Sequence, residues 1–522
     1  MKHQIISRFI IWVLLTALCW NTALAADASK QPSSIDQAMY FKSHVRDAAT
    51  CKQAMKVKKG AIVFDGISNP AITCPDAFGW KQFMEAVQAE FWKNWATDQQ
   101  IWVKKPKPYC GSKSDTDCCE LNEKTGKTNY RGRSSGGNAH CPLFPESMGG
   151  IKLTQFKDKH ALSPHLARQS EVLDDDKSRI ARDTEAEIVY HNKPFFDYSV
   201  THNLYHSNGL IEVFNQQKYQ AASQSPYRPL GQGVSYPETA VMFKVDFISE
   251  DVMKELGYIS DHDNDPDTPM NDANHPYITM NIENPETQAI KTHYLVAVTG
   301  ASKALPNWHW YAFEHVNNIG RCDYIGCNDS YGFQHQVTVN NADDSETTIM
   351  SHYIPPKQIT TELGDTLFVR NEKYASADMT PQLSQLFKAM NIGQGPVSHV
   401  NEDNPMPDVA SAAWQSYRLK GTQTNFYNND GSPVILGASV TEGGFVNTAS
   451  CMSCHVQAGA NANGPNFNTV GGTMSLSLDG IGTVTNGAPE SSVFFQPGTV
   501  QLSTARSDFV WGVLNANPLS ED

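Results

Sequence analysis

The pentapeptide Cys451-Met452-Ser453-Cys454-His455, about seventy residues before the C-terminus, constrains this chain more than any other feature. Two thiols three positions apart, followed at once by a histidine, form the C-x-x-C-H pattern that is typical of covalent attachment of c-type haem. Each thiol can form a thioether to the porphyrin edge, and the imidazole then reaches the iron as its proximal ligand. A disulfide or half of a zinc site would be the alternative, but the sequence has no second C-x-x-C pair to complete the usual structural zinc site. We therefore predict one covalent haem c, held by Cys451, Cys454 and His455.

The first 25 residues are typical of a secretory signal. Lys2 and Arg8 supply the positive start, Phe9 to Trp20 is a mostly apolar run, and Ala23-Leu24-Ala25 is a small-x-small cleavage site. No later run approaches the eighteen or more apolar residues that span a bilayer. We expect an exported, periplasmic protein without a transmembrane anchor after cleavage.

Charge limits the partners of the mature chain. Removing residues 1–25 takes away two basic residues and no acidic one, so the 41 Lys and Arg residues fall to 39 against 55 Asp and Glu, and the net charge goes from −14 to −16. This acidity disfavours nucleic acid and anionic membrane surfaces, and it favours a basic redox partner protein.

Cleavage of the signal removes Cys19, and the eight other cysteines form an even set, which predicts four disulfides in an oxidising compartment. We expect Cys51 to pair with Cys74 and Cys322 with Cys327, because these pairs close short loops. The remaining four are expected to pair among themselves: Cys110, Cys118, Cys119 and Cys141.

The periodicity of apolar residues predicts an α+β fold. Helices are expected over Gly79 to Asp98, Phe195 to Gln216 and Pro381 to Ile392. Alternating residues from Val241 to Phe247 predict a half-buried strand, and further strands are expected over 290–298, 308–316, 334–339 and 348–354. The β-rich central body should be an antiparallel sheet or sandwich with flanking helices and a C-terminal covalent haem segment.

Four segments follow from this pattern. Residues 1–25 are the signal peptide, and 26–160 are a disulfide-rich region with one amphipathic helix. Residues 161–400 form the β-rich body, and 401–522 form the haem-attachment region packed on that body.

Other candidate site residues are less sharply defined by the sequence. Met474 lies in the stretch Gly471-Gly472-Thr473-Met474 and could reach over the haem as a distal iron ligand. His309, His315 and Glu314 lie in an aromatic strand and are candidate distal groups, His309 and His315 as ligands or all three in acid–base chemistry; the alternative is an ordinary aromatic core strand. Asp261, Asp263 and Asp265 alternate in an acidic loop that could bind calcium, although Pro266 replaces the turn glycine of an EF-hand.

Three stretches together resemble a family of large exported bacterial monohaem proteins described as cytochrome c family proteins. They are Trp308 to Asn317, Trp414 to Gln423 and Ala449 to His455, and the ending Asp508-Phe509-Val510-Trp511 is also similar. The resemblance covers about residues 185 to 515. It implies haem and export, and it suggests that the β region and the haem segment work as one unit, but it implies no substrate.

Three functions are compatible with one covalent haem. The first is electron transfer by a periplasmic c-type cytochrome, which we favour. The second is a haem-dependent oxidoreductase that acts on peroxide, a nitrogen oxide or a small organic substrate at an open distal site, because the chain is long enough to build a substrate pocket. The third is a sensor or binding module.

Overall fold

The computed structural model describes residues 47–516, apart from internal gaps. The longer gaps are 103–109, 122–127, 132–180, 224–232, 260–274, 284–289, 361–365, 370–378, 398–407 and 466–486, and the gaps of one or two residues are 111, 117, 182–183, 319, 323–324, 333–334, 355–356, 429–430, 444–445 and 447–448.

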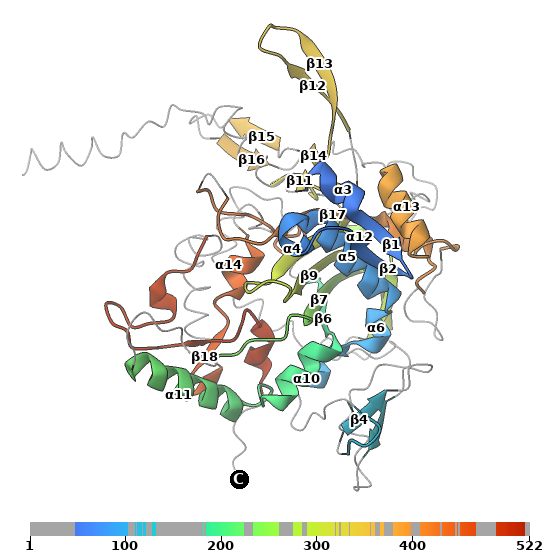
Figure 1. Ribbon diagram of the computed structural model, residues 1–522. Coiled ribbons are helices and arrows are strands. Elements are labelled where there is room, and N and C mark those ends of the chain that lie inside the picture. Colours follow the sequence, from blue (N-terminus) through green and yellow to red (C-terminus); the bar gives the residue numbers. More distant parts are fainter. Residues whose placement is uncertain are drawn as a thin grey trace, which may run out of the picture.

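A seven-stranded antiparallel sheet forms the centre of the protein (Figure 1). Its strand order is β17 (Tyr417–Gln423), β10 (His309–His315), β9 (Ile290–Ser302), β7 (Val241–Ser249), β6 (Ala186–His191) and β3 (Ala96–Thr97), and β8 (Thr279–Glu283) also pairs with β9. The predicted α+β class with an antiparallel body is confirmed. The sheet takes strands from all three predicted segments of the mature chain, since β3 precedes residue 160 and β17 follows residue 400.

Helix α5 (Pro75–Gln88) covers one face of this sheet (Figure 1). The backbone N–H groups of Asp76 and Ala77 donate to the Asp47 carboxylate at 3.0 and 2.9 Å, which caps the start of the helix. Phe83 stacks on Phe313 of β10 with ring centroids 4.5 Å apart. The predicted helix at 79–98 therefore exists, but it begins earlier and ends at Gln88 because Glu90 adopts a left-handed φ of 48°.

Strands β7, β10 and β17 of the sheet are buried on both faces. Strand β7 was expected to be half-buried, yet Lys244 and the terminal Ser249 are its only residues that are not fully buried. Every residue of β10 and β17 is buried as well. The reason is that α5 packs on one face, while the chain around residues 436–456 and the turn at 505–511 pack on the other.

Two helices follow β6 where the sequence predicted one over 195–216. Helix α10 (Lys193–Thr201) has His202 as its C-cap, and α11 (Ser207–Ser223) begins after a turn in which Asn203 has a φ of 55°. Helix α11 lies against the small sheet β19-β18-β20 (Gly464–Pro465, Gly459–Asn461 and Ala505–Arg506), and β18 and β19 of this sheet closely follow the C-x-x-C-H segment in the chain.

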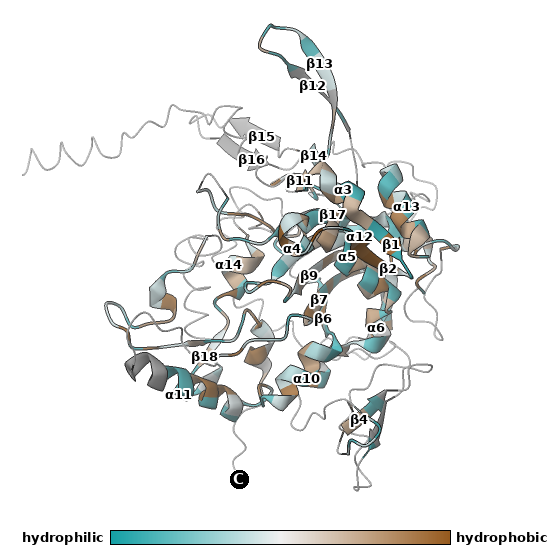
Figure 2. Ribbon diagram, in the orientation of Figure 1, coloured by the Kyte–Doolittle hydropathy of each residue, from teal (hydrophilic) through white to brown (hydrophobic). Residues whose placement is uncertain are grey.

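The remaining described elements are short. The helices are α3 (Ala49–Ala54), α4 (Pro70–Thr73), α6 (Phe91–Asn94), α7 (Asp98–Ile101), α12 (Glu250–Glu255), α13 (Pro381–Ala389) and the 3-10 helices η3 (Ala412–Ser416), η4 (Ser491–Val493) and η5 (Trp511–Asn515). The two-stranded sheets are β1 with β2 (Met55–Lys58, Ala61–Phe64), β4 with β5 (Cys118–Leu121, Thr128–Arg131), β11 with β14 (Cys327–Asn328, Tyr353–Ile354), β12 with β13 (His335–Asn340, Glu346–Ser351) and β15 with β16 (Lys357–Thr360, Thr366–Val369). The β12–β13 hairpin projects from the body, and Figure 2 shows that its tip is hydrophilic.

Disulfides cross-link several of the described segments. The predicted pairs Cys51–Cys74 and Cys322–Cys327 are confirmed, and Cys110 pairs with Cys118. Cys119 is also disulfide-bonded. In the ranges that the structure covers, no helix has the length and apolar character needed to cross a bilayer.

Candidate functional site

The C-x-x-C-H segment forms one short helix, α14 (Cys451–His455). Ser450 caps its start, with the side-chain oxygen accepting from the Ser453 N–H at 3.3 Å. Met452 and Ser453 are fully buried, whereas the two cysteines and the histidine are only half-buried. Helix α14 thus buries Met452 and Ser453 and leaves both thiols and the imidazole partly accessible.

Cys451 and Cys454 are free thiols, while the other described cysteines are all disulfide-bonded. Burial raises the pKa of the Cys454 thiol to about 11, and the negative charge of Glu442 adds to the effect. The same two causes raise the pKa of Cys451.

The side chain of His455 is oriented by a backbone carbonyl. Its Nδ1 donates to the carbonyl oxygen of Phe509 at 2.9 Å. A carbonyl can only accept, so Nδ1 carries the proton and Nε2 keeps its lone pair for a metal. Burial lowers the pKa of His455 to about 4, which keeps the ring neutral at neutral pH. The Trp310 ring lies beside it, with the two centroids 4.5 Å apart.

Gln423 connects this helix to the central sheet. Gln423 ends β17, and its side-chain oxygen accepts from the Met452 N–H at 3.1 Å while its amide nitrogen donates to Ser450 Oγ at 2.8 Å. The stretches around Trp310, Gln423 and His455, which lie far apart in the sequence, therefore meet at one end of the sheet.

A charged cluster lies on the same face of the sheet. Lys244 of β7 forms an ion pair with Glu187 of β6 at 3.2 Å. Carboxylate oxygens of Glu185, Glu187 and Asp246 lie within 4.8 Å of one another, a spacing that could hold a metal ion. Burial lowers the pKa of Lys244, but the surrounding carboxylates, Glu187 first, outweigh it and raise that pKa well above its usual value. The lysine ammonium already supplies a positive charge to this cluster.

The predicted distal groups His309 and His315 lie on the other face of the sheet. Both alternate with Trp310 along β10, and each ring donates through Nε2 to a backbone carbonyl, to Pro75 at 3.0 Å and to Pro276 at 3.3 Å. Both histidines are fully buried, and burial holds the pKa of His315 well below its usual range. The structure therefore does not bring them to His455.

Glu314 lies on the same face as Trp310, but its carboxylate is occupied. One oxygen accepts from the N–H and the Oγ of Ser439, the latter at 2.7 Å, and the other lies 3.4 Å from the Lys420 ammonium. Glu314 fixes the 436–443 segment onto the sheet, so an acid–base role at the iron is not supported. Met474, the acidic residues Asp261, Asp263 and Asp265, and Cys141 lie outside the described residues.

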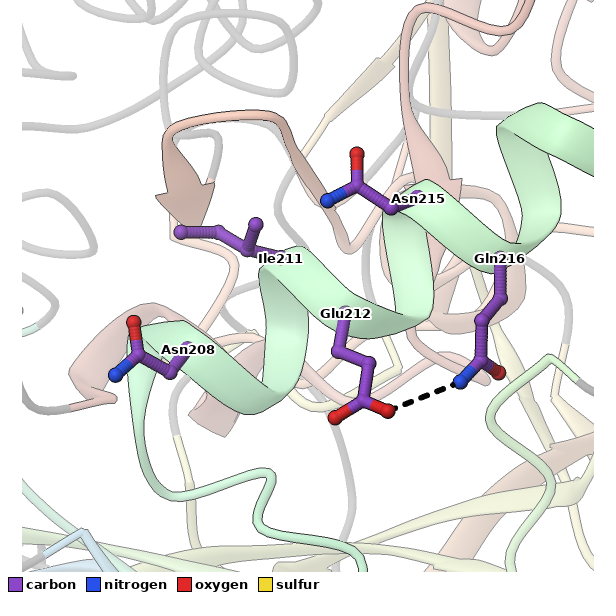
Figure 3. A pocket seen from close by; sticks show the side chains of 5 residues that line it. All are labelled: Asn208, Ile211, Glu212, Asn215 and Gln216. Atoms are coloured by element: carbon purple, nitrogen blue, oxygen red, sulfur yellow. Dashed lines mark hydrogen bonds between the residues drawn. The ribbon is translucent and has the colours of Figure 1, made fainter.

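A shallow hollow of about 490 Å³ lies on the exposed side of α11 (Figure 3). Its described lining comes from one face of that helix, namely Asn208, Ile211, Glu212, Asn215 and Gln216. Glu212 and Gln216 bond to each other at 3.2 Å. None of these residues is a nucleophile or a strong haem ligand.

Sequence reasoning did not identify Gln423 and Phe509 as part of the site. Both belong to motifs that were noted for their resemblance, and that was the available signal. The Gln423 side chain accepts a hydrogen bond from Met452, which lies 29 residues later in the chain. Phe509 contacts His455 through its backbone carbonyl.

Comparisons with known protein families, curated proteins and solved structures return no match for this chain. The chemistry of the site's own residues is therefore the basis for assigning a function.

Proposed function

We propose that this protein is an exported c-type cytochrome that carries one covalent haem and transfers electrons. Cys451 and Cys454 would form the two thioethers, and His455 would be the proximal ligand. The observation that carries the proposal is the geometry of α14: two half-buried thiols without a disulfide partner precede an imidazole whose Nδ1 already donates to the Phe509 carbonyl. This leaves Nε2 as the donor atom for iron.

The surroundings of α14 suit a large, mostly apolar group. Trp310, Phe509, Met452 and Val456 belong to one buried apolar cluster around the helix. Burial in such surroundings limits solvent access to a haem and lowers the polarity around it. Both effects change the reduction potential of the iron. A bound haem would supply a one-electron iron couple, and the protein would supply the His455 imidazole, its orientation and this shielding.

Electron transfer is favoured over the oxidoreductase alternative. General acid–base chemistry on a bound substrate needs a titratable group within reach of that substrate. The three candidates for this role are buried and bonded elsewhere, His309 and His315 to carbonyls and Glu314 to Ser439 and Lys420.

Export is supported by the disulfides, which persist in oxidising compartments.

Covalent attachment is tested by expressing the protein with a haem-maturation system and measuring haem after denaturing electrophoresis. We expect the wild type to retain haem and a Cys451→Ala, Cys454→Ala variant to lose it. The matched control is Cys322→Ala, Cys327→Ala, which removes a cysteine pair of similar spacing and should retain haem. Extraction of the wild-type haem into acidified organic solvent would refute the proposal.

The electron-transfer role is tested on the same holoprotein. A reversible one-electron titration, with a ferric optical spectrum that added peroxide leaves unchanged, would be expected for an electron carrier. A high-spin spectrum that changes on adding peroxide would instead support the oxidoreductase.

A further inference from the structure

The Phe509 carbonyl, which accepts the hydrogen bond from His455 Nδ1, lies in an unusual turn. Asp508 has a φ of 54° and Phe509 a φ of 68°, so two consecutive residues with side chains adopt the left-handed region. Aspartate tolerates this conformation, but it is an outlier for a bulky residue such as phenylalanine. Such a turn persists when neighbouring contacts hold it.

The contacts that hold the turn converge on Asp508. Its Oδ1 pairs with the Lys303 ammonium at 2.5 Å, and both side chains are more than nine-tenths buried, at 7% and 8% exposure. Its Oδ2 accepts from the Tyr236 N–H at 2.8 Å. Lys303 is fixed in turn, because it also donates to the Pro306 carbonyl at 2.8 Å and lies 5.6 Å from the Trp308 ring centre.

The same turn is tied to α14 at two points. The Ser507 N–H donates to the carbonyl of Ala458 at 3.0 Å, directly after the helix, and the Phe509 carbonyl accepts from His455 at 2.9 Å. Lys303 directly follows β9 and Tyr236 precedes β7, so the turn is anchored to the end of the central sheet. Side-chain substitution cannot delete a carbonyl, but removing the Asp508 anchor can move it.

We propose that Asp508, through its ion pair with Lys303, is a positioning residue that keeps the Phe509 carbonyl on Nδ1 of His455 and thereby tunes the haem iron. This inference rests on the proposed function, in which His455 is the proximal ligand. A hydrogen bond from Nδ1 to a carbonyl makes the imidazole a stronger electron donor and stabilises ferric iron. Loosening the turn should therefore raise the reduction potential.

The test compares the midpoint potential of wild-type holoprotein with that of Asp508→Ala and Lys303→Met. We expect both variants to shift upward, by about 59 mV for each tenfold loss of relative ferric stabilisation. The two changes should be non-additive in the double variant, because both break one ion pair. Asp508→Asn keeps an oxygen for the Tyr236 N–H, so its shift should be smaller. The control is Asp251→Asn, which removes an exposed carboxylate paired with Lys291 and should leave the potential unchanged.

A second readout separates orientation from general damage. The Nδ1 proton of His455 should exchange with solvent at least several-fold faster in Asp508→Ala than in wild type, as seen by proton NMR of the reduced protein. If Asp508→Ala fails to fold, Lys303→Met gives the answer. An unchanged potential and exchange rate in a folded, haem-loaded Asp508→Ala or Lys303→Met variant would overturn the inference. Absence of covalent haem from wild type would instead overturn the proposed function.

Discussion

Removing Lys420 should destabilise the fold strongly, because it leaves the Glu314 carboxylate buried without its cation. The two side chains are 1% and 0% exposed and lie 3.4 Å apart. Breaking a buried pair by deleting one partner costs about 3–5 kcal/mol, whereas replacing both partners by neutral groups of similar shape is often close to neutral. In Lys420→Met, the carboxylate keeps the two hydrogen bonds from Ser439 but no positive charge within this pair.

The assay is a double-mutant cycle in urea, followed by circular dichroism. We expect Lys420→Met to lose about 3–5 kcal/mol and the double variant Glu314→Gln, Lys420→Met to be the more stable of the two. Lys291→Met is the control, since its ion pair with Asp251 is exposed and such pairs contribute little.

Two results would refute this reasoning. Equal stability of Lys420→Met and the double variant would mean that the uncompensated carboxylate is not the source of the loss. A changed haem spectrum in folded Glu314→Gln would indicate that Glu314 acts at the iron rather than as an anchor of the 436–443 segment.

Three further predictions follow from buried groups. Burial raises the pKa of Asp47 from 3.8 to about 6, so the native state binds more protons than the unfolded chain between these values. The unfolding free energy should therefore fall by roughly 2 kcal/mol as the pH rises from about 4 to about 6, and Asp47→Asn should show a shallower slope than wild type in urea titrations across that window. A Cβ added at Gly300 would lie 2.4 Å from the Tyr311 ring, so Gly300→Ala should cost about 1–3 kcal/mol, and an unchanged urea midpoint would contradict it. Gln423→Met removes the acceptor of the Met452 N–H, and this amide should exchange with deuterium at least about tenfold faster, corresponding to about 1.4 kcal/mol; wild-type protection would contradict the link between β17 and α14.

Local sequence information predicted a large part of this structure. The periodicity of apolar residues located β7, β9 and β10, and two cysteine pairs that close short loops were correctly assigned. Helix boundaries were less accurate, as at 195–216, where a left-handed Asn203 separates two helices. Neighbouring residues determine such features, so they can be read without knowing the rest of the fold.

The sequence by itself also determined which residues could hold a haem, because the two thiols and the imidazole are adjacent in the chain. Only the tertiary structure decided what surrounds them. A period of two shows that His309 and His315 share a face of β10, but it cannot show which face meets α14 when both faces of that strand are buried. The partner of His455 is a backbone carbonyl, which every residue type carries, so its identity depends on where the fold brings the turn at Asp508 and Phe509.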